Sequence, residues 1–326
     1  MATSSSTSPR RRGGLRGLAR SGKGLAVSLL GEDRFLTARA GAQLWLDRRK
    51  GKQLLMVHTM GKVGSTTVAY SLKTRRIRRT MAMYQPHFVS EEGMAFAERL
   101  SSEGVGGWDR LTSKERRGFL RNHLLNQELR RMRASGERVK VITMVRDPVA
   151  TNLSGLFHNH IWWPADVKAL CAEHSAGCLD ALCQYFLARY PHDVPETWFD
   201  MEVRTLYGVD VYTEPFDHER GYHIYRSDFA DVLLLKLEKL NECAPAALRD
   251  FLGLEDFQLV ESNTAEDKSY ADLYKRFRRE VALPESYLDA IYGTRFSRHF
   301  YTPAEIDAFR RKWLAPAATR PAPAMA

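Results

Sequence analysis

The chain has 326 residues and a mass of 37.2 kDa, which is enough for one large α/β domain or two small ones with a sizeable buried core. Its 44% hydrophobic and 27% charged residues are those of an ordinary soluble globule and exclude wholesale disorder. The net charge of +10 lies almost entirely in residues 1–52, which hold 12 Lys and Arg against 3 Asp and Glu. The other 274 residues carry about +1, so the body of the chain does not have the charge of a nucleic-acid-binding protein.

The basic N-terminal segment comes first along the chain. Its Ser, Thr, Arg and Gly residues offer too little apolar surface to offset the entropy of ordering, so we predict a disordered basic arm over residues 1–30. The arm is either a solubilising segment or a loose contact to an anionic membrane or another polyanion. The apolar run Leu25–Leu30 is too short for a signal peptide, and no run is long enough to cross a bilayer. We expect a cytoplasmic protein, or one peripheral at the inner face of the membrane, with no specific nucleic-acid partner.

From about Leu44 the hydrophobic pattern alternates between strands and helices. We predict strands at residues 53–59, 80–84 and 139–145, a further apolar run at 231–240, and helices at 66–73, 91–133 and 149–160 and one ending at 251–254. This alternation indicates an α/β fold, a P-loop-like three-layer arrangement with a mainly parallel sheet and helices on both faces. We assign residues 31–314 to one domain and 315–326 to a disordered tail. In such sheets ligands bind beyond the carboxyl ends of the strands.

The first strand end that carries chemistry is the segment Thr59–Thr67. Gly61 and Gly64 let the backbone approach an anion closely, and the following helix offers unpaired N–H groups at its positive end. Lys62 adds a charge, and Ser65, Thr66 and Thr67 add hydroxyl donors. This predicts a phosphate cradle, although the lysine precedes the second glycine, unlike in the Walker pattern. A plain turn between strand and helix is the alternative.

The second strand end is the segment Arg146–Ser154. A guanidinium at the strand end and a hydroxyl two turns into the helix can face one anion, while Asp147 and Pro148 suit the start of the helix. Arg146 alone could equally form a structural ion pair. The two strand ends together are more specific than either one.

At these residues the chain resembles the PAPS-dependent sulfotransferases, whose donor is 3′-phosphoadenosine 5′-phosphosulfate. Their Pro-Lys-x-Gly-(Ser/Thr)-Thr motif binds the 5′-phosphosulfate, and Gly61–Thr66 matches it with Gly61 in the place of proline. Their Arg and the Ser eight positions later bind the 3′-phosphate, and Arg146 and Ser154 match both. A third likeness lies in Leu237–Leu240 and Phe251–Leu254, so the resemblance spans about residues 53–255. Within this superfamily the later half is similar to a bacterial capsular polysaccharide synthesis group at residues 198–202, 215–217 and 298–301.

The resemblance implies transfer of a sulfuryl group from PAPS to a hydroxyl of a carbohydrate acceptor, with PAP as product and without a metal. Lys62 would neutralise the departing 5′-phosphate. The phosphate would be held by the hydroxyls and the backbone N–H groups of Val63–Thr67, and the 3′-phosphate by Arg146, Ser154 and Lys268. Such a reaction depends on positioning and charge stabilisation. The acceptor stays open: capsular polysaccharide, a lipid-linked sugar and a small glycoside all fit.

A general base must take the proton of the acceptor hydroxyl, and histidine suits that task near neutral pH. We choose His87, at the end of a strand expected near Lys62, with a purely structural histidine as the alternative. His58 lies inside an apolar strand and is expected in the core, whereas His158 and His160 line the acceptor cleft or lie on the surface. Glu202 is a weaker alternative base, and a solvated charge is the simpler interpretation of it.

Other charged and cysteine residues favour ordinary roles. The basic groups Arg75–Arg79 and Lys275–Arg279 are expected to be solvated helix faces, with attraction to an acidic polysaccharide as the alternative. Cys171, His174, Cys178 and Cys183 lack the paired spacing of a zinc site, so we expect the cysteines to be small buried side chains in a reducing compartment.

Two other functions remain open besides sulfuryl transfer. An ATP- and magnesium-dependent kinase is disfavoured by the missing Gly-Lys-(Ser/Thr) sequence, and only Asp147 stands at a strand end as a metal-binding carboxylate. A non-enzymatic protein that binds a nucleotide or polyanion through its basic arm is the second alternative.

Overall fold

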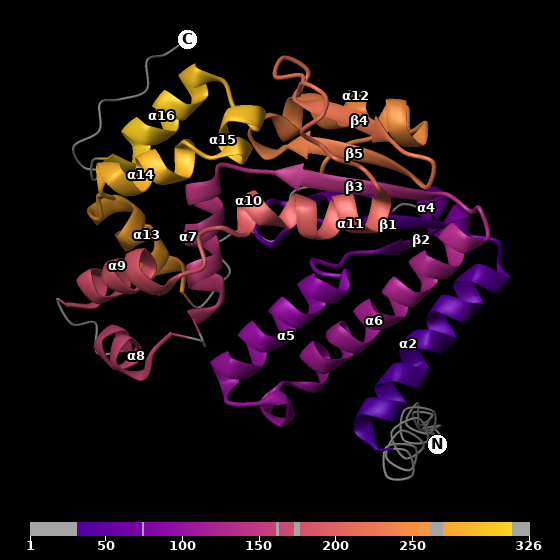
Figure 1. The fold of residues 1–326 in the computed structure, drawn as a ribbon, viewed down its shortest axis with the longest axis horizontal. Coiled ribbons are helices and arrows are strands. Elements are labelled where there is room, and N and C mark those ends of the chain that lie inside the picture. Colours follow the sequence, from indigo (N-terminus) through magenta and orange to yellow (C-terminus); the bar gives the residue numbers. More distant parts are fainter. Residues whose placement is uncertain (1–30, 74, 161–162, 173–176, 261–269, 315–326) are drawn as a thin grey trace, which may run out of the picture.

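A five-stranded sheet lies at the centre of the protein. The computed structural model describes residues 31–73, 75–160, 163–172, 177–260 and 270–314 (Figure 1). The strands follow the order β2–β1–β3–β5–β4. Parallel pairing joins β2 (Met81–Tyr84), β1 (Gln53–Val57), β3 (Val139–Val145) and β5 (Ala230–Lys236), and β4 (Tyr222–Arg226) pairs antiparallel with β5 at the edge. The expectation of an α/β fold with a mainly parallel sheet is confirmed.

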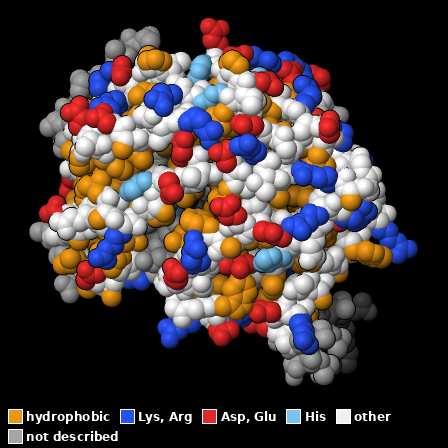
Figure 2. All heavy atoms as spheres, in the orientation of Figure 1, with side chains coloured by type: hydrophobic (Ala, Val, Ile, Leu, Met, Phe, Trp, Pro, Cys, Tyr) orange, Lys and Arg blue, Asp and Glu red, His pale blue; other side chains and the backbone are white. Residues whose placement is uncertain are grey.

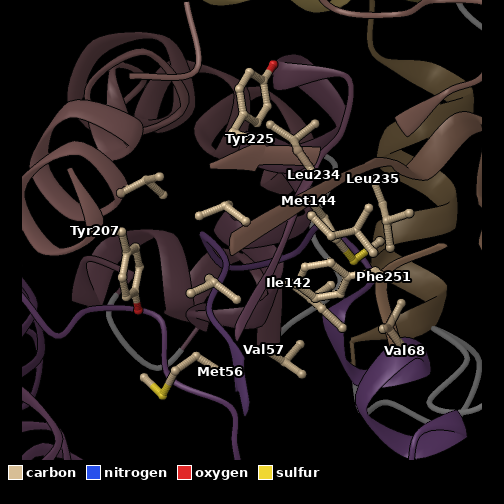
Figure 3. Packing of buried hydrophobic residues seen from close by; sticks show 14 of the residues in the cluster. Met56, Val57, Val68, Ile142, Met144, Tyr207, Tyr225, Leu234, Leu235 and Phe251 are labelled. Atoms are coloured by element: carbon tan, nitrogen blue, oxygen red, sulfur yellow. The ribbon is translucent and has the colours of Figure 1, made fainter. Parts of the chain in front are cut away.

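Helices cover both faces of the sheet, which is why its central strands are continuous apolar runs. Side chains of α3 (Ser65–Ser71) and α12 (Leu240–Leu252) pack on one face, and those of α11 (Thr205–Tyr207) on the other. Figure 3 shows Val68 and Phe251 on one side of the strands and Tyr207 with Met56 on the opposite side. The predicted placement of helices on both faces is therefore confirmed.

The remaining elements extend this frame. They are α2 (Glu32–Arg49), α4 (Arg75–Thr80), α5 (Glu91–Val105), α6 (Ser113–Ala134), α7 (Pro148–His158), α8 (Ala165–Ala172), α9 (Cys178–Arg189), α10 (Val194–Trp198), α13 (Ala271–Glu280), α14 (Glu285–Tyr292), α15 (Arg295–Phe300) and α16 (Pro303–Leu314), with a π-helical segment at Phe199–Arg204 and 3₁₀ turns at Trp108–Arg110 and Leu237–Lys239. In Figure 1, α5 and α6 form a pair below the sheet, and α7 runs down beside them from the end of β3.

Three predicted boundaries differ from the structure. The helix expected at residues 91–133 is two helices, because Gly106 and Gly107 adopt positive φ angles of 85° and 128° and Thr112 caps a new helix in a capping box. Thr80 ends α4 instead of opening β2, and the apolar run 231–240 leaves the sheet after Lys236. The helix predicted to end at 251–254 is α12, and the basic run 275–279 lies on α13 as expected. The edge strand β4 and the other helices that follow residue 160 were not predicted, because their short apolar stretches have no clear period.

The order of the strands places a topological switch beside β1. The chain crosses from β1 to β2 on one side and then returns to β3 on the other side of β1. The connections that leave the carboxyl ends of β1 and β3 therefore diverge, and such a point is where open α/β sheets bind ligands.

A second apolar cluster surrounds α7. Val149, Leu153 and Phe157 of this helix pack with residues of α9, α13, α14 and α16. The C-terminal helices thus brace the helix that starts directly after Arg146.

Cys171 and Cys178 form a disulfide between α8 and the start of α9, while Cys183 and Cys243 are free. The expectation that the cysteines act only as small buried side chains is therefore wrong for this pair. Disulfides persist mainly in oxidising surroundings, so the reducing compartment inferred from the cysteine count loses its support.

Some predictions concern residues that the structure does not describe. The arm at residues 1–30, the tail at 315–326, His174 and Lys268 lie outside the described residues. Within the described ranges, no helix has both the length and the apolar character needed to cross a membrane.

The disulfide predicts the number of reactive thiols. After denaturation without reductant, two thiols per chain, Cys183 and Cys243, should react with iodoacetamide, and four should react after reduction. Intact mass spectrometry of the alkylated chain measures this directly. Four modified thiols before reduction, in protein purified without reductant, would contradict the pairing.

Candidate functional site

The turn after β1 has a constrained backbone. Lys62 has a φ of 70°, the one positive φ angle of a non-glycine residue in the described part of the chain, and Gly64 has a φ of 86° directly before α3. The positive φ of Gly64 favours glycine there, and a Cβ atom would also come within 2.6 Å of Leu237 Cδ1 and force that side chain to move. Left-handed backbone at a charged residue is costly and often marks a functional turn.

Arg146 ties the second strand end to the first. Its Nη1 donates a hydrogen bond of 2.8 Å to the carbonyl oxygen of Lys62. β1 and β3 are parallel neighbours, so the turns that follow them meet at one edge of the sheet. The structure thus brings together two predicted site residues that are 84 positions apart in the sequence.

Asp147 is fully engaged in holding the second turn. Its carboxylate accepts hydrogen bonds from the Val149 N–H, the Tyr292 hydroxyl at 2.8 Å and the Trp313 indole at 3.1 Å, and only 2% of the residue is exposed. Its own N–H donates to Glu238 Oε1 at 2.7 Å. Asp147 is therefore a helix cap and an anchor for the C-terminal helices, with no free oxygen directed at a ligand.

One further basic residue, Lys312, approaches this turn, and the sequence reasoning did not assign it there. Lys312 on α16 stacks its Nζ at 4.5 Å from the ring of Trp313, which in turn binds Asp147. Partial burial lowers the pKa of Lys312, and the nearby charges of Arg278 and Arg146 act in the same direction. No sequence motif marks Lys312, because its place beside Arg146 arises only from packing of α16.

Ser154 lies two turns into α7 and is partly exposed. Its neighbours Thr151, Asn152 and Gly155 line a large cavity, but Ser154 is not in that wall. The proposed contribution of Ser154, like that of Lys268, stays a prediction.

A cavity of 790 Å³ opens beside the Lys62 turn. The segment after β2, the facing sides of α5, α6 and α7, and the region of α9 and α10 form its walls; they include Gly61, Lys62, Gln85, His87, Phe88, Phe96, Phe119, Arg121, Asn122, Thr151, Asn152, His158, Trp163, Tyr185 and Tyr190. Figure 2 shows acidic and basic side chains interspersed over the visible face rather than gathered in one patch. The mixture of aromatic rings, amides and a few charges in the cavity fits a polar ligand with apolar faces.

His87 is oriented as a base should be. Its Nδ1 lies 2.7 Å from the carbonyl oxygen of Thr59; a carbonyl only accepts, so Nδ1 carries the hydrogen and Nε2 of the neutral ring is the basic nitrogen. His87 is an exposed residue that lines the cavity. The protein atoms packed around its ring desolvate the charged form and lower the pKa of His87 below its usual 6.5, and the charges of Lys62 and Arg121 add to the effect.

A buried carboxylate holds the segment that carries His87. Glu202 has no exposed surface, and it accepts hydrogen bonds from the N–H groups of Val89 and Ser90 and from the Ser90 hydroxyl, at 2.7–3.0 Å. His58 Nε2 lies 3.1 Å from the same carboxylate, and His58 Nδ1 lies 2.8 Å from the Tyr207 hydroxyl. The interpretation of Glu202 as a solvated charge is wrong, and so is the alternative of a base, because Glu202 does not reach the cavity.

Trp198 fixes the same segment from the other side. Its indole nitrogen donates to the carbonyl oxygen of His87 at 2.8 Å, and its ring meets His58 edge to face. His58 is completely buried, as predicted. Trp198 and Glu202 lie one turn of helix apart, and this spacing was the one sign in the sequence that they share a face. Nothing in the sequence shows that this face contacts residues 87–90.

Of the other predicted residues, some line the cavity and others lie on the protein surface. His158 lines the cavity, whereas His160 does not; its Nδ1 lies 3.2 Å from the carbonyl oxygen of Phe157. Arg78 and Arg79 are exposed, as are Lys275, Arg278 and Arg279, so the prediction of solvated helix faces is confirmed for these residues. Among described residues, no group of three or more His, Cys, Asp or Glu side chains is arranged to hold a metal ion.

Comparison with known families gives one match. Residues 180–302 match the family model described as "Putative capsular polysaccharide synthesis protein". The matched segment contains Trp198 and Glu202, which hold the His87 segment, and Glu238, which holds the Arg146 turn, but neither Lys62 nor Arg146 themselves. No curated protein and no solved structure matches the chain.

The Glu202 contacts predict a large loss of stability on substitution. Glu202→Gln places an amide against several donors and should lower the free energy of unfolding by about 1–3 kcal/mol, and Glu202→Ala by about 3 kcal/mol or more, because buried N–H groups lose their acceptor. Urea unfolding followed by fluorescence measures both. Glu91→Gln, an exposed carboxylate on α5, is the matched control and should change stability by at most about 1 kcal/mol. Equal effects of Glu91→Gln and Glu202→Gln would contradict the anchoring role.

Proposed function

We propose that the protein is a sulfotransferase that moves a sulfuryl group from PAPS to a hydroxyl of a carbohydrate acceptor. The observation that carries this proposal is the contact of Arg146 with the Lys62 carbonyl. It sets a lysine turn and an arginine turn side by side at the switch point of the sheet, where one nucleotide with phosphates on both its 5′ and 3′ positions can reach both.

The donor is held by charge at its two ends. Lys62, the N–H groups of Val63–Thr66 and the hydroxyls of Ser65, Thr66 and Thr67 bind the 5′-phosphosulfate; the Thr67 N–H donates to the Gly64 carbonyl oxygen. Arg146, with Ser154 and Lys268, binds the 3′-phosphate, and the position of Lys312 supports an added contribution from α16. These contacts grip the nucleotide and place its reactive end toward the cavity beside Lys62 and His87.

The reaction needs a base and a stabilised leaving group. His87 Nε2 takes the proton of the acceptor hydroxyl as its oxygen forms a bond to the sulfur of the donor. The bond from sulfur to the 5′-phosphate oxygen breaks, and the electron pair stays on PAP, where Lys62 balances the new charge. No protein nucleophile is needed, because both reactants are aligned in one cavity.

The position of Asp147 argues against the kinase alternative. A kinase of this topology would need a strand-end carboxylate for magnesium, and the Asp147 oxygens are already bound by Val149, Tyr292 and Trp313. The family match over residues 180–302 supports a place in capsular or surface polysaccharide synthesis, and hence a carbohydrate acceptor.

Nucleotide binding tests the donor assignment. By calorimetry, 3′,5′-ADP should bind more tightly than 5′-AMP or ATP with magnesium. Arg146→Gln should weaken the binding of 3′,5′-ADP by about tenfold or more and leave the binding of 5′-AMP nearly unchanged, because only the 3′-phosphate loses its charged partner.

Lys62→Ala should lower kcat by about a hundredfold with a smaller effect on the binding of 3′,5′-ADP. The control for Lys62→Ala is Lys73→Ala, at an exposed lysine that follows the end of α3. A preference for ATP with magnesium and indifference to a 3′-phosphate would reject the proposal.

The pH dependence of turnover tests His87. The base must be neutral, and its pKa is lowered, so kcat/KM should hold at pH 7 and fall only as the pH drops through a value below 6.5. His87→Asn preserves a donor to the Thr59 carbonyl but supplies no base. It should reduce kcat by about 10²-fold or more and remove the acidic limb, while 3′,5′-ADP still binds.

His160→Asn is the matched control for His87, because His160 also places Nδ1 against a backbone carbonyl but does not line the cavity. It should leave the profile unchanged. An acidic limb that survives in His87→Asn would assign the base to another residue.

A further inference from the structure

Arg121 is a cationic residue of the cavity wall that the proposed reaction does not use. It lies on α6, in the wall that faces His87 and α7. Its Nε is buried and has no hydrogen-bond partner, and its Nη2 makes one long bond of 3.5 Å, to the Oδ1 of the adjacent Asn122. A guanidinium has five N–H donors, so most of the donor capacity of Arg121 is unused by the described residues.

The acidic residues near Arg121 do not neutralise it. No carboxylate in the described ranges forms an ion pair with Arg121. Glu103 and Glu115 both line the same cavity. Glu115 is bound to the N–H and hydroxyl of Thr112 in the capping box, and Glu103 is exposed to solvent. The nearby Asp47 is bound by Lys52 and by the Tyr84 hydroxyl. Arg121 is partly exposed, but a guanidinium whose Nε is buried without a partner or counter-charge is costly, and ligand-binding sites are where that cost has a use.

We propose that Arg121 binds an anionic group of the acceptor, so that the acceptor is an acidic saccharide bearing a carboxylate or a phosphate. Phe96 and Phe119 beside it in the wall offer apolar surfaces to the C–H faces of a sugar ring, and Asn122 offers an amide to its hydroxyls. The anion sits at Arg121 and the hydroxyl to be modified at His87. The acceptor role rests on the proposed function, whereas the anion site itself does not.

Binding without any donor tests the anion site alone. The probes are 4-nitrophenyl β-glucoside, the β-glucuronide, which differs only in a carboxylate, and the β-glucoside 6-phosphate. At least one acidic probe should bind the wild-type protein about tenfold or more tightly than the glucoside, and the better one identifies the anion. Affinity for the acidic probe should fall with added salt. Equal affinities for all three probes, or no binding of either acidic probe, would overturn the proposal.

Substitution places the anion on Arg121. Arg121→Gln should abolish the preference for the acidic probe and leave glucoside affinity unchanged, and Arg121→Lys should retain part of the preference. The control is Arg117→Gln, one turn earlier on α6, where the same change of charge occurs at an exposed residue outside the cavity wall. Thermal unfolding of each variant shows whether it is folded. A folded Arg121→Gln that keeps the preference, or an Arg117→Gln that loses it equally, would overturn the assignment.

The two proposals fail separately. Arg121-dependent binding of an acidic probe without sulfation by PAPS would reject the reaction and keep the anion site. Sulfation of the neutral and acidic probes at equal rates, unchanged in Arg121→Gln, would keep the reaction and reject the anion site.

Discussion

The hydrogen bond from Arg146 to the carbonyl oxygen of Lys62 joins the two turns on which the site is built. It exists because β1 and β3 are adjacent parallel strands, so their carboxyl ends meet although 84 residues separate the two side chains. The positive φ of Lys62 presents that carbonyl to the guanidinium, and Gly64 lets the following helix start against Leu237. A shift of either strand by one position would turn these side chains to opposite faces and dismantle the pair.

Residues in the C-terminal half of the chain hold the segments of this site in place. Glu202 and Trp198 hold the segment of His87, and Glu238, Tyr292 and Trp313 hold the turn of Arg146. The family match begins at residue 180 and so covers most of these supports, while the residues that would contact the donor lie earlier in the chain. The matched segment, residues 180–302, therefore contains residues that orient the site. Lys62, His87 and Arg146, which are proposed to touch a ligand, lie earlier in the chain.

The cavity beside these turns has charges of both signs in its wall. Lys62 and Arg121 lie there together with Glu103 and Glu115; Glu115 is bonded to Thr112, and no carboxylate of the described residues forms an ion pair with Arg121. The same positive charges help to keep His87 neutral, because protonation of its ring would add a further cation to the site. Under the two proposals, the cations that would attract an anionic acceptor also favour the neutral form of the proposed base.

The sequence alone determined the α/β class, the mainly parallel sheet and the nearness of the Lys62 and Arg146 turns, because apolar strands that end in Gly, Lys and Arg give a local signal and parallel strands align their carboxyl ends. It misjudged Glu202, because a carboxylate is usually exposed even when Met201 and Val203 flank it, and it misjudged the pair Cys171 and Cys178. It gave no role to Arg121 or Lys312. Only the tertiary structure decided these, because the burial and partners of a side chain are set by elements far away in sequence, as when Val89 and Ser90 supply the donors that make a buried carboxylate stable.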